Sequence, residues 1–295
     1  MVVTAFPLTG ETEWERSIML RIVIPKLILE LGRLYNRHTN FRRGRDAHSR
    51  LICWGIKNLG FRPPLIRLKC GTVFEYSPEV ALDVLPIDLV LNGEFEPRET
   101  RVLREFLPQD GVFIDVGANI GYFSILAAKW VGPNGRVFAF EPVTAIYKVL
   151  SRNIALNTLQ HVVSPFRLAC FSSFGEMSMK RSIDSGKSHL IRAAESNDEV
   201  VSLTTVDHFV EQNKISRIDC IKIDTEGSDL EVLKGCKRVI ARFRPPIIIE
   251  TDNLERFGGS AADVREFFYE VGYSISEMKI DHSLDFVCLP KLERG

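Results

Sequence analysis

Residues 112–121 (VFIDVGANIG) combine an apolar run, an acidic residue and a glycine-rich turn. The pattern predicts a buried strand over 112–116 followed by a helix from Gly121, and the glycines allow the backbone to turn sharply beside a ligand. A dinucleotide site typically has the spacing G-x-G-x-x-G, but Asn119 stands in place of the second glycine. The loop therefore favours a nucleoside without a pyrophosphate, and Asp115 favours a positively charged ligand. The alternative is a tight strand–helix turn that binds nothing.

Glu141 follows a second predicted strand, over 136–140. It lies about 20 residues beyond the loop, the separation at which an acidic residue binds the ribose in nucleotide-binding sheets. A carboxylate at this position can accept hydrogen bonds from both ribose hydroxyls. Alternatively, Glu141 is an acid at a helix N-terminus, where the helix dipole favours negative charge and Pro142 takes the first helical position. Taken with the loop, Glu141 favours ligand binding.

A further acidic group follows the predicted strand over 220–223. The period of two in a strand places Asp224 on the same side as Lys222. Carboxylates here can orient a hydroxyl group and accept its proton, so Asp224 and Glu226 are candidate catalytic residues. In the structural alternative, Glu226 caps the next helix and Asp224 only pairs with Lys222. No metal site is predicted, because no ligand spacing typical of one is present and carboxylates alone do not establish a Mg²⁺ site.

Alternating strands and helices from Gly111 onward must position these side chains. Near-continuous apolar strands between helices indicate an α/β fold with a mostly parallel sheet covered on both faces. Ligands of such sheets bind beyond the carboxyl ends of the strands, where Glu250 is a further candidate for the acceptor site. The predicted strands are 112–116, 136–140, 162–169, 220–223 and 247–250, with a closing pair at 273–276 and 286–289. The predicted helices are 98–106, 121–130, 143–157, 206–212, 228–241 and 261–271.

Residues 1–91 are predicted to form an N-terminal α+β extension to a domain over 92–295. The extension contains a small predicted hairpin, formed by 65–68 and 72–76 around Cys70 and Gly71. Residues 18–34 are predicted to form an amphipathic helix, which Pro25 kinks and charged residues make unsuitable for spanning a bilayer. We expect this helix to dock on the catalytic domain or on a second subunit. The alternative is peripheral contact with a membrane surface.

The balanced charge argues against a broad surface for nucleic acid or for an anionic membrane. Lys and Arg together number 38 and Asp and Glu together number 38, so the chain has no excess of basic residues for a broad nucleic-acid surface.

The six cysteines have no zinc-binding or C-x-x-C spacing and suit a reducing compartment, so we expect a cytoplasmic location. No signal peptide is recognised. Composition does not define the oligomeric state.

Several segments between Asn92 and Glu250 together resemble the FkbM family of class I methyltransferases. They occur in the family's order and read IDVGANIGYFS, FAFEP, NIALN, IDCIKIDTEGSDLEVLKG and RPPIIIE. The resemblance implies a Rossmann-like class I methyltransferase sheet, mostly parallel with the last strand antiparallel. It also implies S-adenosyl-L-methionine as the cofactor and O-methylation, often of a sugar or a polyketide-type hydroxyl. We therefore expect a small-molecule or glycan acceptor.

The resemblance also implies which residues bind the cofactor. Ser172 stands where many members have an Asp that accepts a hydrogen bond from the adenine, and a serine hydroxyl accepts one more weakly. The other implied cofactor-binding residues are Asp115, Gly117, Asn119, Gly121 and Glu141. Two alternatives stay open: a catalytically inactive methyltransferase-fold binding module, and a nicotinamide-dependent oxidoreductase. The missing G-x-G argues against the second.

Overall fold

The computed structural model describes residues 65–68, 70–75, 89, 93–180, 188–191, 198–280 and 283–291, together with Val23, Ile24, Leu27 and Trp54. The predicted helix over 18–34 lies almost entirely outside the described residues, so its docking stays a prediction. Over the described residues, no helix is both long and apolar enough to cross a membrane.

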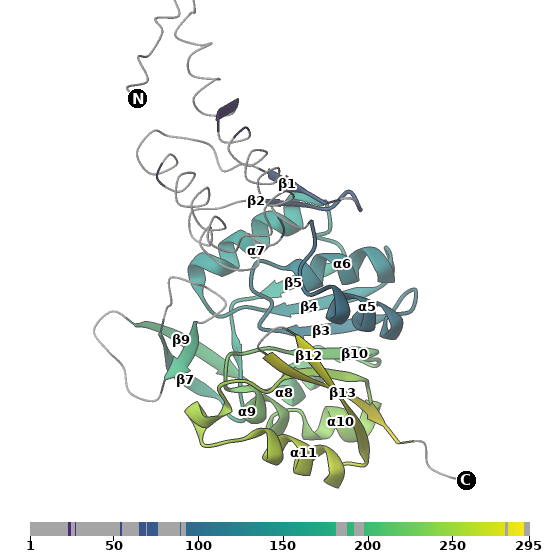
Figure 1. Ribbon diagram of the computed structural model, residues 1–295, viewed down its shortest axis with the longest axis vertical. Helices are drawn as coiled ribbons and strands as arrows, with labels where there is room; N and C mark the ends of the chain where they lie inside the picture. The colour runs from purple at the N-terminus through teal and green to yellow at the C-terminus, as the bar shows by residue number, and fades with distance from the viewer. Residues whose placement is uncertain are drawn as a thin grey trace, which may run out of the picture.

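A seven-stranded sheet forms the centre of the molecule (Figure 1), in the order β12-β13-β11-β10-β3-β4-β5. β13 runs antiparallel to both of its neighbours, and the remaining neighbours pair in parallel. The chain leaves the sheet centre in opposite directions from β3 and β10, which makes their junction the topological switch point. The strands are β3 (Val112–Val116), β4 (Arg136–Phe140), β5 (Val163–Phe166), β10 (Cys220–Ile223), β11 (Ile247–Glu250), β12 (Tyr273–Ile280) and β13 (Ser283–Pro290). The predicted α/β fold class with an antiparallel last strand is confirmed.

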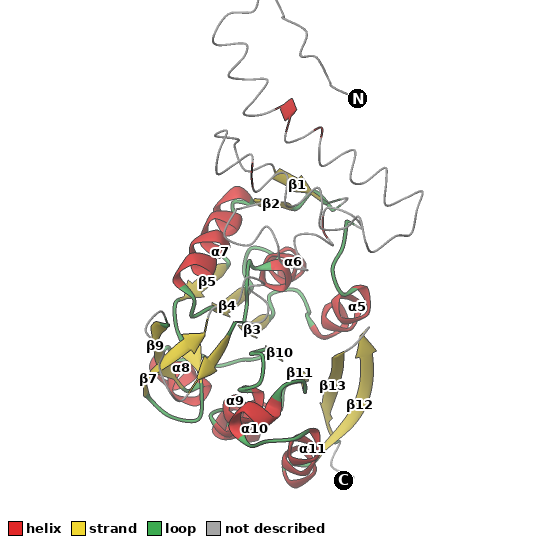
Figure 2. Ribbon diagram, turned by 60° about the vertical axis from the view of Figure 1, so that its left-hand side comes forward, coloured by secondary structure: helices red, strands yellow, loops and turns green. Residues whose placement is uncertain are grey.

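Helices cover both faces of this sheet (Figure 2). One face carries α5 (Pro97–Phe106), α6 (Tyr122–Val131) and α7 (Thr144–Leu156); the other carries α8 (Val206–Gln212), α9 (Asp229–Lys234), α10 (Lys237–Phe243) and α11 (Ala261–Glu270). Each face has its own hydrophobic core, and the strands feed the two cores alternately. Phe113 enters the core under α6 and α7, whereas Ile114 enters the core over α8 to α11. This alternation decides which face each polar residue at a strand end occupies.

The structure corrects the predicted strand over 162–169. It divides into β5 and the short β6 (Ala169–Cys170), which leaves the central sheet and pairs with β9 (Glu199–Thr204). A second, four-stranded sheet results, in the order β6-β9-β7-β8, with β7 (Gly175–Lys180) and β8 (His189–Ile191). Its partners are distant in sequence, so the local pattern of apolar residues does not reveal it.

The predicted helix over 228–241 is also divided, into α9 and α10, at Gly235 and Cys236. The chain passes so close to the loop after β6 that a Cβ added to Gly235 would lie 2.2 Å from the carbonyl oxygen of Phe171. A continuous helix with a larger residue at this position would collide with that backbone. Glycine at this position therefore lets the segment pass close to the second sheet.

The predicted hairpin is confirmed as β1 (Leu65–Arg67) and β2 (Val73–Glu75), which pair antiparallel. Ile66 and Phe74 are fully buried in the same core as α6 and α7. The hairpin thus packs on the domain that follows it. The division of the chain at residues 91 and 92 stays a prediction.

Asn153 of α7 and Asn157, which caps the C-terminus of that helix, hold the hairpin by hydrogen bonds to its backbone. The Asn157 side chain accepts a hydrogen bond from the Val73 N–H at 2.9 Å and donates one to the Val73 carbonyl at 2.6 Å. The buried Asn153 accepts from the Glu75 N–H at 2.8 Å and donates to the carbonyl of Ile120 at 2.9 Å. Asn153 therefore connects the hairpin to the glycine-rich loop after β3.

We expect the Asn153→Leu variant to lose about 2–4 kcal/mol of unfolding free energy, because two buried backbone groups lose their partner. Urea unfolding followed by circular dichroism measures this loss. Ser151→Ala is the matched control on the same helix, since the Ser151 hydroxyl bonds only the carbonyl of its own helix at Tyr147. Equal stability of the two variants would show that the hairpin is not anchored through Asn153.

Candidate active site

Acidic side chains line one edge of the central sheet, on the face covered by α5 and α6. For four of the acids the strand residue two positions away belongs to the core under α6, and for Asp224 it is Cys220, four positions away, that does; alternation therefore turns all five acids toward that same face. Because β13 is antiparallel, the beginning of β13 lies at the same edge as the ends of its neighbours. The acids are Glu141 after β4, Asp115 in β3, Asp224 after β10, Glu250 in β11 and Asp285 in β13.

The ammonium group of Lys222 lies within this acidic row. Its side chain is 4% exposed, and Nζ lies 2.6 Å from Asp224 Oδ2 and 3.4 Å from Glu99 Oε1. The same nitrogen lies 4.7 Å from the centre of the Phe123 ring. Burial by itself would lower the pKa of Lys222, but Asp224 and the other nearby carboxylates hold that pKa well above its usual range. Lys222 is therefore a buried cation that forms ion pairs with the acids around it.

Sequence reasoning missed the two carboxyl groups that α5 brings to this row. Glu99 is 3% exposed and pairs with Lys222. Burial raises the pKa of Glu96 well above its usual range, and a hydrogen bond to the Glu99 carboxyl raises it further. The available signal was the segment Gly93–Pro97 (GEFEP), which also resembles the entry segment of the FkbM family and carries Glu96 at the start of α5.

The loop after β3 is built from three residues with left-handed backbone. Gly117, Asn119 and Gly121 have φ angles of +85°, +49° and +88°. Asparagine is among the few residues other than glycine that adopt this conformation readily, which accounts for its place in the pattern. The N–H groups of Gly117 and Ala118 both donate to the carbonyl of Phe140, at 3.0 Å and 2.9 Å. These amides are used within the protein, which argues against a loop that cradles a pyrophosphate.

Glu141 braces this loop from the neighbouring strand. Its Oε2 accepts a hydrogen bond from the Asn119 N–H at 3.1 Å, and its Oε1 accepts one from the Val143 N–H at 2.8 Å. Burial raises the pKa of Glu141 to about 7, although both N–H groups favour the ionised form. A carboxylate has about four acceptor positions, so two are left for further donors such as ribose hydroxyls.

Asp115 is the most deeply buried acid of the loop region, at 1% exposure. The hydroxyl of Ser124 on α6 donates to its Oδ2 at 2.5 Å. Burial raises the pKa of Asp115 to about 6, while Lys222 and Ser124 act in the opposite direction. This carboxylate is suited to a cationic ligand at the start of α6, because a positive charge there would favour its ionised form.

The glycine-rich loop and the backbone at Asp224, just after β10, lie in close contact. A Cβ added to Gly117 would lie 1.8 Å from the backbone carbonyl oxygen of Asp224, so only glycine fits between the two segments. The same glycine has a left-handed φ. The loop after β3 and the turn after β10 are therefore neighbours in the fold.

Ser172 makes its contact with a residue outside the sequence-predicted set. Its hydroxyl donates a hydrogen bond to Glu231 Oε2 of α9 at 2.5 Å, and Glu231 also pairs with Lys234. Ser172 is partly buried, at the start of the loop between β6 and β7. Its role toward an adenine stays a prediction.

The turn after β10 bears on the alternative in which Glu226 caps the next helix. Glu226 does not cap α9; instead, Asp229 accepts hydrogen bonds from the N–H groups of Thr225 at 2.8 Å and Gly227 at 2.9 Å. The Glu226 backbone is left-handed, with φ +57°, and its Oε2 accepts a hydrogen bond from Asn253 at 3.3 Å. The predicted pairing of Asp224 with Lys222 is present. Glu226 is thereby turned toward Asp224.

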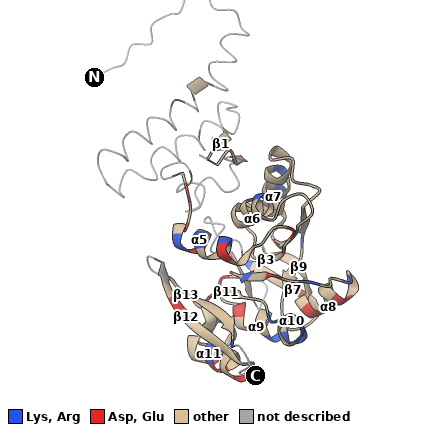
Figure 3. Cartoon of the chain, turned by 90° about the vertical axis from the view of Figure 1, so that its right-hand side faces the viewer, with Lys and Arg blue, Asp and Glu red and all other residues tan. Residues whose placement is uncertain are grey.

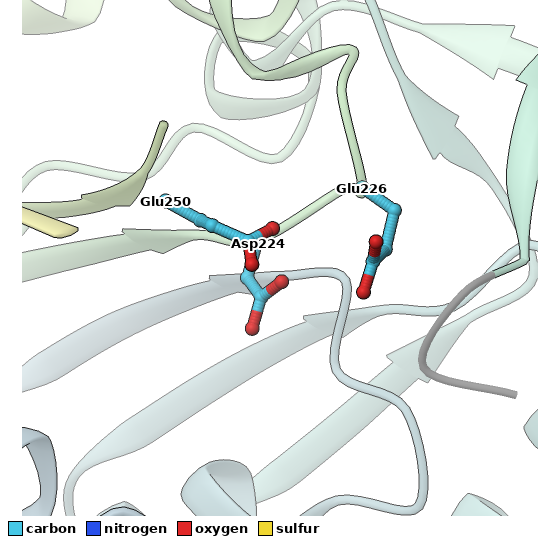
Figure 4. A group of neighbouring side chains, drawn as sticks. All are labelled: Asp224, Glu226 and Glu250. Carbon is cyan, nitrogen blue, oxygen red and sulfur yellow. The ribbon is translucent and has the colours of Figure 1, made fainter. Parts of the chain in front are cut away.

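Three carboxylates meet at this point (Figure 4). Asp224 and Glu250 extend from the ends of adjacent parallel strands, and Glu226 approaches from the loop after β10. One oxygen of each lies within 4.8 Å of the others. Elsewhere on the described surface, basic and acidic residues are interspersed on the helices (Figure 3), as the balanced composition predicts.

The chain is similar to several known methyltransferases. The model of the Methyltransferase FkbM domain matches residues 115–275, which is more than half of the chain. The hexuronic acid methyltransferase AglP of Haloferax volcanii is 28% identical over 243 residues, which cover 81% of this chain and 94% of that protein. The methyltransferase sdnD of Sordaria araneosa is 29% identical over 176 residues, covering 49% of this chain and 68% of that protein. A solved structure of methyltransferase FkbM from Methylobacillus flagellatus has a TM-score of 0.44 at 15% identity, covering 68% of this chain and 52% of that one.

The acidic row makes the stability of the cofactor-free protein depend on pH. Burial raises the pKa of Asp285 to about 8, and those of Asp229 and Asp115 to about 6. A folded-state pKa above the unfolded value means that stability is fully present below about pH 4 and is lost as pH rises through the folded pKa. We therefore expect these groups to lower stability from about pH 4 to about pH 8.

The Asp285→Asn variant should show a flatter decline over this range than the wild type. Urea midpoints measured in buffers free of divalent ions provide the test. Glu211→Gln is the control, because it removes an exposed carboxylate on α8 that pairs with Arg238. An unchanged slope in Asp285→Asn would contradict the assignment.

Proposed function

The chain belongs to the FkbM methyltransferase family, and from this premise we propose that it transfers the methyl group of S-adenosyl-L-methionine to a hydroxyl oxygen of a sugar, a glycan or a small metabolite. The contact between Gly117 and the carbonyl of Asp224 carries the proposal, because it joins a nucleoside-type loop to carboxylates that can hold an acceptor. Methyl transfer requires the donor carbon and the acceptor oxygen to be held in line at short range.

We assign the cofactor to the loop after β3 and to Glu141. The two free acceptor positions of Glu141 suit the ribose hydroxyls, and the buried Asp115 suits the cationic part of the molecule. The left-handed residues Gly117, Asn119 and Gly121 bring the backbone close without side chains in the way. When bound, S-adenosyl-L-methionine supplies a methyl group whose bond to sulfur breaks as the bond to the acceptor oxygen forms.

Asp224 and Glu226 act on the acceptor in this proposal. They accept the hydrogen bond of its hydroxyl, orient its oxygen toward the cofactor and take the proton as the oxygen becomes methylated. Lys222 fixes one oxygen of Asp224, which leaves the other oxygen directed at the acceptor. Lys222 is thus a positioning residue, since it acts through Asp224.

A hydroxylated carbohydrate is the acceptor class that the relatives favour, since one of them is named for hexuronic acid. The oxidoreductase alternative is not supported by the family match, and the loop amides bonded to Phe140 argue against a pyrophosphate site. The predicted cytoplasmic location remains part of this proposal. The described thiols of Cys170, Cys220 and Cys236 are buried and free, as in a protein that does not depend on disulfides.

Saturating S-adenosylhomocysteine should bind the purified protein and raise its melting temperature, because a ligand of the native state stabilises it. Radiolabelled S-adenosyl-L-methionine should then label an acceptor in a panel of uronic acids, sugar nucleotides and hydroxylated metabolites. The product should carry an O-methyl group by NMR. No binding of S-adenosylhomocysteine would contradict the cofactor assignment, and a methylated nitrogen would contradict the proposed acceptor atom.

Two substitutions should separate the cofactor from the acceptor. Glu141→Ala should weaken S-adenosylhomocysteine binding by about 1–3 kcal/mol, the range for a lost hydrogen bond to a charged group. Asp224→Asn keeps the shape of the side chain but loses its basicity. It should leave that affinity unchanged and lower kcat by about 10²-fold or more, as for a lost general base. Calorimetry and saturation kinetics measure the two effects. Equal losses of cofactor affinity in both variants would place Asp224 in the cofactor site instead.

A further inference from the structure

The carboxylates of Asp224, Glu226 and Glu250 form a cluster whose geometry suits a metal ion. One oxygen from each lies within 4.8 Å of the other two. Ligands on opposite sides of a cation at 2.0–2.6 Å are separated by about 4–5 Å, so one ion can contact all three after small side-chain movements. The three groups come from two adjacent strand ends and one loop and face a common space (Figure 4).

Glu250 provides an independent sign that a ligand is needed there. Its Oε2 atom is buried and has no hydrogen-bond partner, the one such side-chain atom among the described residues. A buried carboxylate oxygen without a partner is costly, and native proteins normally satisfy such atoms. Burial, with Asp224, Glu226 and Asp229 nearby, raises the pKa of Glu250 well above its usual range. Lys222 acts in the opposite direction but does not cancel this effect.

The neighbouring side chains are already engaged and do not meet this need. Asp229 uses its two oxygens for the N–H groups of Thr225 and Gly227. Lys222 bonds Asp224 Oδ2, which leaves Asp224 Oδ1 for another partner. Neither side chain donates a hydrogen bond to Glu250 Oε2.

We propose that Asp224, Glu226 and Glu250 bind one hard divalent cation, of the Mg²⁺ or Mn²⁺ class. A ligand set made only of carboxylate oxygens selects such ions over zinc or copper, which favour nitrogen and sulfur ligands. Three protein oxygens leave open positions in an octahedral shell for water or for an acceptor.

The role of the cation in catalysis rests on the proposed function, whereas the binding of the cation does not. The cluster lies at the Asp224 end of the contact with Gly117, so a cation there would lie beside the acceptor hydroxyl. A bound cation lowers the pKa of a coordinated hydroxyl and fixes its direction. It would also offset the negative charge that the acidic row presents to an anionic sugar.

Titration of the chelator-treated full-length protein with Mn²⁺, followed by the electron paramagnetic resonance signal of the free ion, tests the proposal. We expect one Mn²⁺ per chain, displaced by excess Mg²⁺. Glu250→Gln should weaken the affinity at least about tenfold, because substitutions around metal sites commonly cost 10–100-fold. The metal-free Glu250→Gln protein should melt at a temperature no lower than the wild type, since it loses an unsatisfied buried carboxylate.

Asp252→Asn is the matched control. It removes the same charge two residues away, at a carboxylate outside the cluster that accepts a hydrogen bond from the Leu284 N–H at 3.4 Å. Its Mn²⁺ affinity should stay within about threefold of the wild type, whereas a specific ligand is worth more. Equal weakening in both variants would show diffuse attraction and overturn the proposal, as would no binding at 1 mM Mn²⁺.

Methyl transfer measured with and without chelator separates this proposal from the proposed function. Mn²⁺ binding that depends on Glu250, in a protein that methylates no acceptor, would uphold the cation site and leave the function in question. Full methyl transfer in chelator by a protein that binds no Mn²⁺ would uphold the function and overturn the cation site.

Discussion

The buried ammonium group of Lys222 is the interaction on which the arrangement of the site depends. A buried cation is tolerated only when carboxylates compensate it, and here the partners come from different elements: Asp224 from the end of β10 and Glu99 from α5. Docking of α5 on this face therefore brings Glu99 to Lys222, and the GEFEP segment before the helix brings Glu96. Removal of the lysine charge would leave several buried acids without a counterion. The ion pair between Lys222 and Asp224 also fixes the direction of the Asp224 side chain. Lys222 therefore both compensates buried charge in the fold and positions a candidate catalytic residue.

Strand alternation and sheet order explain why so many acids converge. Successive side chains of each central strand point alternately into the two hydrophobic cores. The acid at the strand end lies on the same face as the core under α6. The strand order then places β3, β10 and β11 side by side at the switch point. Close passage of the backbone at Gly117, where a side chain would collide with the Asp224 carbonyl, joins the cofactor loop to this row. The site is thus a consequence of the topology rather than of any single motif.

The acidic row is unfavourable for the protein in isolation. Burial raises the pKa of Glu141 to about 7 and that of Asp285 to about 8, so ionising either group costs more in the cofactor-free protein than in water. Active sites commonly retain such groups because ligands offset their cost and function selects them. A cationic cofactor beside Asp115 and a cation at Glu250 would both supply the missing positive charge. Binding and stability are therefore expected to be coupled through the same carboxylates.

The sequence by itself determined the elements whose signal is local. The strands β3, β4, β10 and β11 lie at their predicted bounds because each is a short, mostly apolar run that ends at an acidic residue or at a glycine. The loop, Glu141 and the pairing of Asp224 with Lys222 also follow from spacing and from the period of two in a strand. Only the tertiary structure decided the second sheet, the break at Gly235, the partner of Ser172 and the meeting of Glu99 and Asp285 with Lys222. Periodicity specifies the face on which a side chain lies, but its partner there is set by packing between segments far apart in the chain.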